Sequence, residues 1–138
     1  MRRLRCCLLP AACCLLLAGC GSRMSPVRGI VTLDDGTLLT KGLVIFEAQI
    51  DGKPVMARGE IKPDGSYQLG TAKTGDGAWP GKYRVLINPM DLSDLPDEQK
   101  NIPFDYKYMR YETSGLEFEV KPGANEFLIK LDRARRRR

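Results

Sequence analysis

Residues 27–36 form the stretch VRGIVTLDDG. Its side chains alternate between two faces, which is the period of a strand with one buried side. The run stops at Asp34-Asp35-Gly36, where Asp-Gly supplies the positive φ angles of a tight hairpin turn. We therefore expect a first strand over residues 27–33, closed by a turn.

The same pattern continues along the chain. Extended runs bounded by turn residues follow at residues 42–48, 55–61, 66–69, 82–87, 116–120 and 126–131. Pro63-Asp64-Gly65 predicts a hairpin between the second and third of these runs, and Lys121-Pro122-Gly123 predicts that the last two close the domain as a pair. About seven strands, with no helical period after the first 20 residues, predict an all-β two-sheet sandwich with Greek-key connections. A small barrel is the alternative.

The first 19 residues predict a helical signal peptide. Three arginines precede an apolar stretch, Leu8 to Leu17, which is shorter than the roughly 20 residues that span a bilayer. Leu17-Ala18-Gly19-Cys20 resembles the lipobox of bacterial lipoproteins, in which the cysteine thiol accepts a diacylglyceryl group. We expect Cys20 to carry palmitate-type acyl chains and to hold the protein on a membrane. The alternative is an ordinary secretory peptide with an incidental cysteine.

The remaining chain divides into a tether over residues 20–26, a sandwich domain over residues 27–132 and a basic tail over residues 133–138. Gly21 rather than aspartate follows the cysteine, which by resemblance to sorting in double-membrane bacteria implies the outer membrane. Residues 24–132 contain 13 basic and 17 acidic residues, a net charge of −4, so the +5 of the whole chain comes from its two ends.

The arginine tail is a local feature of the chain. We expect a disordered arm that contacts anionic headgroups, lipopolysaccharide or another polyanion through Arg135, Arg136, Arg137 and Arg138. A solvated tail that serves only solubility is the equal alternative. Export from the cytoplasm and the lack of a binding fold argue against nucleic acid as a partner.

Residue types argue against an enzyme. There is no histidine, and all five cysteines lie at or before residue 20, so the mature domain has neither a disulfide nor a cysteine or histidine nucleophile pair. Neither a metal nor a cofactor is expected. The aspartates stand in separate turns whose backbone requires Asp-Gly, which disfavours a calcium site: Asp34, Asp35, Asp51, Asp64 and Asp76. Glu117 and Glu119 suit a solvated strand face better than glycoside hydrolysis.

Residues 88–114 form a long irregular segment, a kind of loop that is usually functional or disordered. Aromatic residues gather in it, and with one tryptophan they are the candidate ligand-binding residues: Trp79, Tyr106, Tyr108 and Tyr111. Such a surface suits stacking on sugar rings or gripping a partner. The alternative is that these rings, with Met90, Phe104 and Met109, cover an open end of the sandwich. Of the three tyrosines we expect Tyr106 to be the most buried.

Three groups of motifs resemble a family of small lipoproteins of planctomycete-like bacteria, known as carboxypeptidase regulatory-like or transthyretin-like domain proteins. The stretches are residues 27–34 with 42–46, residues 59, 64–67 and 80–85, and residues 102–106, 113–116 and 120–125. The resemblance implies a transthyretin (prealbumin)-like sandwich without established catalysis, and no residue here matches the zinc-binding residues of carboxypeptidases.

These observations predict a non-catalytic, lipid-anchored envelope protein that displays a loop surface for protein or polysaccharide contact. A purely structural or accessory envelope module without a dedicated ligand is the alternative, and a hydrolase is a weaker one. The oligomeric state does not follow from the sequence.

Overall fold

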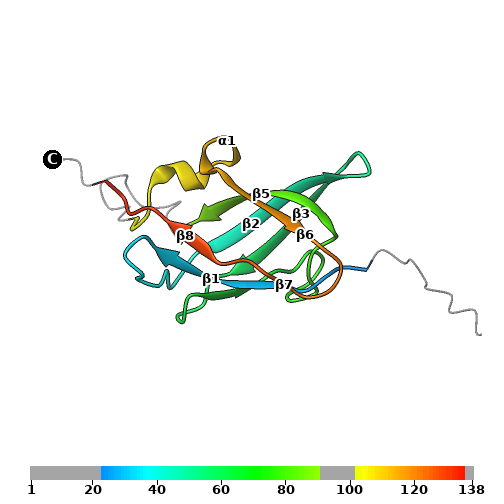
Figure 1. Ribbon diagram of the computed structural model, residues 1–138, viewed down its shortest axis with the longest axis horizontal. Coiled ribbons are helices and arrows are strands. Elements are labelled where there is room, and N and C mark those ends of the chain that lie inside the picture. Colours follow the sequence, from blue (N-terminus) through cyan, green and yellow to red (C-terminus); the bar gives the residue numbers. More distant parts are fainter. Residues whose placement is uncertain (1–22, 91–101, 136–138) are drawn as a thin grey trace, which may run out of the picture.

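The computed structural model describes residues 23–90 and 102–135, in which two sheets pack face to face (Figure 1). One sheet has the order β4-β1-β7, with β8 also paired to β1, and the other has the order β3-β2-β5-β6. The expected all-β sandwich is confirmed, with eight strands because the last expected strand is divided. The elements are β1 (Val27–Leu33), β2 (Leu43–Ile50), β3 (Lys53–Glu60), β4 (Ser66–Gln68), β5 (Gly81–Asn88), η2 (Tyr106–Met109), α1 (Tyr111–Ser114), β6 (Leu116–Val120), β7 (Asn125–Glu126) and β8 (Ile129–Leu131).

Strand β1 is the centre of its sheet, and its alternation is the expected one. Val27, Val31 and Leu33 are buried, whereas Arg28 and Ile30 are exposed. β4 pairs with β1 in antiparallel orientation, and β7 and β8 pair with it in parallel orientation. The buried side chains of β1 face those of β2 and β5, so one apolar core fills the space between the sheets.

The two expected strand pairings are found only in part. The turn at residues 63–65 does return the chain in antiparallel fashion, since the Lys62 N–H donates to the Ser66 carbonyl at 2.9 Å and Arg58 and Gly70 exchange two hydrogen bonds, although β3 and β4 belong to different sheets. The expected closing pair is wrong, because β6 pairs with β5, whereas β7 pairs with β1. In both places the chain turns and then enters the other sheet, from β3 to β4 and from β6 to β7.

The turn at residues 34–36 is present. After it, Leu38 forms only an isolated bridge with Thr32, and the next strand, β2, belongs to the other sheet. The hairpin that does form joins β2 to β3 across Asp51 and Gly52, both with positive φ. Asp-Gly therefore marks turns correctly in this chain without identifying which strands pair.

The last expected strand is divided at Phe127. The Tyr67 hydroxyl donates a hydrogen bond of 2.7 Å to the Phe127 carbonyl, which lies so close to Gly29 that a side chain there would collide with it. The Phe127 ring stacks on Phe118 of β6 with the ring centroids 4.5 Å apart. Phe127 therefore contacts both sheets, through Tyr67 of β4 and Phe118 of β6, and it interrupts the strand that was expected here.

The two ends of the sandwich differ in what they carry (Figure 1). The tether end holds residues 23–26 and the loops at residues 51–52, 71–80 and 121–124, since Ser25 pairs with Ala78 and β1 begins beside β7. The far end holds residues 34–41, 102–114 and 132–135, since Phe104 pairs with Arg133. The expected signal peptide and Cys20 lie outside the described residues, and none of the described helices is long and apolar enough to cross a membrane.

Candidate functional site: the far end of the sandwich

The far end is built largely by residues 102–114, which belong to the segment expected to be a long loop. Its residues 102–105 run beside the C-terminal residues 132–134, with a hydrogen bond of 2.9 Å from the Asp105 N–H to the Asp132 carbonyl. The Asp105 carboxylate then caps η2 by accepting from the Lys107 N–H at 3.0 Å. Helix α1 follows, and the buried Ser114 hydroxyl at its end donates to the Val85 carbonyl of β5 at 2.6 Å. The described part of this segment is therefore ordered by specific polar contacts.

The candidate aromatic residues do not form one surface. Tyr108 is 5% exposed and Tyr106 is 57% exposed, so the expectation that Tyr106 is the more buried is wrong. The reason is the phase of η2, which turns Tyr108 toward the core beside Phe104 and leaves Tyr106 on the outside. The Tyr108 hydroxyl accepts a hydrogen bond from the Asp132 N–H at 3.1 Å. Its ring is therefore a structural part of the far end.

The other two candidates lie apart from Tyr106. Tyr111 is half-buried, and its ring stacks under the Arg84 guanidinium, 5.1 Å from the centroid, while Arg84 forms an ion pair of 2.9 Å with Glu47. Trp79 lies at the tether end, where its carbonyl accepts from the Tyr83 hydroxyl at 2.8 Å. The far end thus presents a single strongly exposed candidate ring, that of Tyr106, among the described residues.

Ion pairs hold the C-terminal residues on the far end. Arg133 forms ion pairs with Asp35 and, at 3.9 Å, with Asp34, and it donates to the Thr37 hydroxyl at 3.0 Å. Lys107 pairs with Asp132. Arg133 is therefore fixed against the first turn, and Arg135 is exposed and is the last described residue. Arg136, Arg137 and Arg138, the rest of the expected polyanion contact, lie outside the described residues.

The turn at residues 35–37 has an acidic carboxyl group. The Thr37 backbone N–H, 3.0 Å from the carboxylate, contributes most to lowering the pKa of Asp35 to about 2, and Arg133 lowers it further. Because the folded pKa lies below the ordinary value of 3.8, the stabilisation from this contact is complete above pH 3.8 and is lost as the pH falls toward about 2.

We expect Arg133→Gln to raise the pKa of Asp35 only part of the way to 3.8, because the Thr37 N–H remains. Carboxyl carbon chemical shifts followed by NMR from pH 6 to pH 1.5 measure this pKa. Asp64 is the internal control, since the pKa of its carboxyl group is lowered by Ser66 and should not change. A return of Asp35 all the way to 3.8 would show that the arginine, not the turn, holds the carboxylate.

The carboxylates of the turn aspartates accept hydrogen bonds from nearby backbone N–H groups. Asp64 accepts from the Ser66 N–H at 3.0 Å, and Asp76 accepts from three successive N–H groups, those of residues 71–73, at 2.6–3.1 Å. Across residues 23–90 and 102–135, no group of three or more acidic, cysteine or histidine residues is placed to hold a metal ion.

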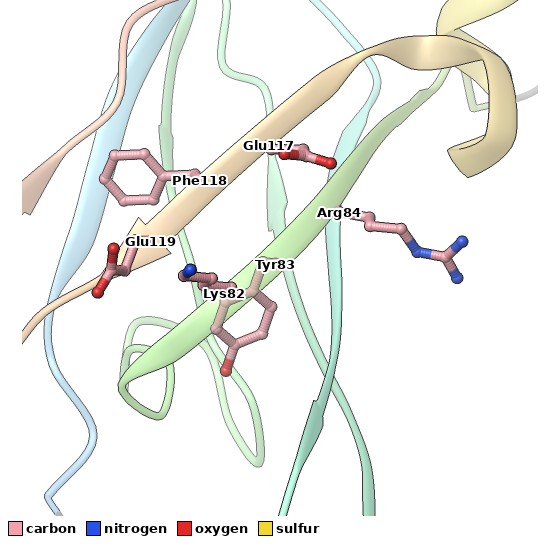
Figure 2. A pocket seen from close by; sticks show the side chains of 6 residues that line it. All are labelled: Lys82, Tyr83, Arg84, Glu117, Phe118 and Glu119. Carbon is pink, nitrogen blue, oxygen red and sulfur yellow. The ribbon is translucent and has the colours of Figure 1, made fainter.

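A shallow hollow of about 360 Å³ lies on the outer surface of β5 and β6 (Figure 2). Figure 2 shows its four charged side chains spread over the two strands rather than converging on one point. In register, Glu117 stands beside Arg84 and Glu119 stands beside Lys82. Opposite charges alternating on an exposed sheet face match the solvated face expected for the two glutamates, and they differ from the apolar surroundings in which a catalytic acid is usually held.

No family model, no curated protein and no solved structure matches the chain. The placement of the chain's own residues therefore carries the functional proposal.

Proposed function

We propose that this chain is a non-catalytic lipoprotein of the bacterial cell envelope, anchored through Cys20 and displaying the far end of its sandwich for contact with a protein or polysaccharide. The carrying observation is the Leu17-Ala18-Gly19-Cys20 sequence five residues before Ser25, where the ordered domain begins to pair. The resemblance to transthyretin-like lipoproteins supports the same proposal, and outer-membrane sorting is part of it.

The geometry suits display. The tether and the far end lie at opposite ends of the sandwich, so a lipid on Cys20 would direct Tyr106 and Arg135 away from the anchoring membrane (Figure 1). This favours a polyanion of the envelope that lies away from the anchoring membrane, over the lipid headgroups or lipopolysaccharide of that membrane, as the contact of the arginine tail.

A second candidate function is a structural or accessory module without a dedicated ligand. The burial of Tyr108 beside Phe104 favours it, because a candidate ligand-binding residue is part of the core instead.

We expect Cys20→Ala to abolish lipidation and to release the protein from the membrane fraction. Mass spectrometry of the wild-type chain should identify an acylated cysteine as its first residue, because the thiol is the acceptor of the diacylglyceryl group. The mature chain has no other cysteine to substitute for it. Ser22→Ala, two residues away, is the matched control and should leave both lipidation and membrane association unchanged. An unmodified Cys20, or a retained signal peptide, would contradict the proposal.

A further inference from the structure

The loops at the tether end carry an excess of basic side chains. The exposed residues concerned are Arg23, Lys53, Lys73 and Lys121. None of the ion pairs found within residues 23–90 and 102–135 involves them. This end is therefore positive, although residues 24–132 as a whole have a net charge of −4.

The acidic residues nearby compensate this charge only in part. Asp76 is drawn into its own loop, where its carboxylate accepts from the N–H groups of residues 71–73. Glu119 stands beside Lys82 on the neighbouring strand and balances that lysine. Glu126 of β7 stands beside Arg28 in register, and Asp51, in the β2–β3 turn, is the remaining exposed carboxylate of these loops.

The tether joins this same end of the domain. Ser25 is 3% exposed, its N–H donates to the Ala78 carbonyl at 2.8 Å, and its carbonyl accepts from the Ala78 N–H at 3.0 Å. A Cβ on Gly77 would lie 2.3 Å from the Ser25 carbonyl oxygen, so the tether is held closely against the loop. Ser25 is the fifth residue after Cys20, which limits the distance between them to about 17 Å at roughly 3.3–3.6 Å per residue.

We infer that the tether end of the sandwich docks on the anionic headgroups of the membrane that holds the lipid. This inference rests on the proposed lipidation of Cys20. The short tether brings the basic loops within reach of the headgroups, and each basic side chain near an anionic surface adds to the attraction. The lipid and the basic loops then act as two membrane signals, and docking fixes the orientation in which the far end is displayed.

The chain contains its own reporter for this contact. Trp79 is the single tryptophan, and it follows Ala78, the partner of Ser25, at the tether end. The full lipidated protein is reconstituted into vesicles of phosphatidylcholine alone or with 30% phosphatidylglycerol, both containing a headgroup-labelled nitroxide lipid. We expect strong quenching of Trp79 fluorescence in the anionic vesicles only, reversed by high salt because salt screens exposed charges.

Two matched triple variants each remove three exposed lysines, one set at the tether end and the other set away from it. Lys53→Gln, Lys73→Gln and Lys121→Gln together should weaken docking about 100-fold, by the usual contribution of basic residues near an anionic surface, and should abolish the quenching. The control triple, Lys41→Gln, Lys62→Gln and Lys130→Gln, removes the same charge from exposed positions away from the tether end and should retain it. Equal melting temperatures of the two triples exclude a folding defect.

The outcomes are distinguishable. Protein that floats with the vesicles but shows equal quenching in neutral and anionic lipid, or equal loss in both triples, overturns the docking inference alone. Protein that does not float with the vesicles shows that the lipid anchor is absent, and it overturns the proposed function together with this inference.

Discussion

Replacing Gly29 by alanine is expected to prevent the domain from folding stably. A Cβ at this position would lie 1.9 Å from the Phe127 carbonyl oxygen and 2.8 Å from the Tyr67 hydroxyl. Neither atom can yield easily, because the two are hydrogen-bonded to each other at 2.7 Å and Tyr67 is buried. We expect a loss of about 3 kcal/mol or more, the upper part of the range for overpacked cores. That loss is a large fraction of the roughly 5–15 kcal/mol that stabilises a typical domain.

The matched control for this prediction is Gly36→Ala. Gly36 has a φ of +85°, but a Cβ there would meet no atom within 4 Å, so the cost is that of the left-handed backbone alone, about 1–2 kcal/mol. Urea unfolding followed by circular dichroism measures both variants. If Gly29→Ala were no less stable than Gly36→Ala, the close approach of β1 to Phe127 would be absent in solution.

The strands of this domain could be predicted from the sequence because their signal is local. Alternation of apolar and polar residues identifies β1 and β6 at the bounds that the structure has. The partners of the strands could not be predicted, since pairing depends on which sheet each buried face joins. Pro63-Asp64-Gly65 and Pro122-Gly123 are turns in the structure, yet each leads from one sheet to the other.

The far end was less predictable for a similar reason. Tyr106 and Tyr108 are the same type of residue and lie only two positions apart in the sequence. Their opposite burial follows from the short 3₁₀ helix η2, whose phase is set by the cap at Asp105. An aspartate two residues before a lysine is a weak signal by itself. The contact between Arg133 and the first turn joins residues almost a hundred positions apart, which no local pattern reveals.

The tyrosines of η2 separate the structural role of the far end from a binding role. Tyr108→Ala should reduce the free energy of unfolding by about 3–5 kcal/mol, because truncating a buried aromatic side chain leaves a cavity in the core. Tyr108→Phe keeps the ring and loses only the hydrogen bond from the Asp132 N–H, at a cost of about 1 kcal/mol. Thermal and urea unfolding of the two variants measure this difference.

Tyr106→Ala is the matched variant that tests contact with the envelope. Its ring is exposed, so the melting temperature should stay nearly unchanged and the free energy of unfolding should change by less than about 0.5 kcal/mol. Aromatic residues at a binding surface commonly carry a large share of the binding energy, so this variant should capture less polysaccharide or protein from envelope extract than the wild type. Capture that is unchanged by Tyr106→Ala, with Tyr108→Ala unfolding as expected, would favour the accessory module over the binding one, since no other candidate tyrosine exposes its ring as fully at the described far end.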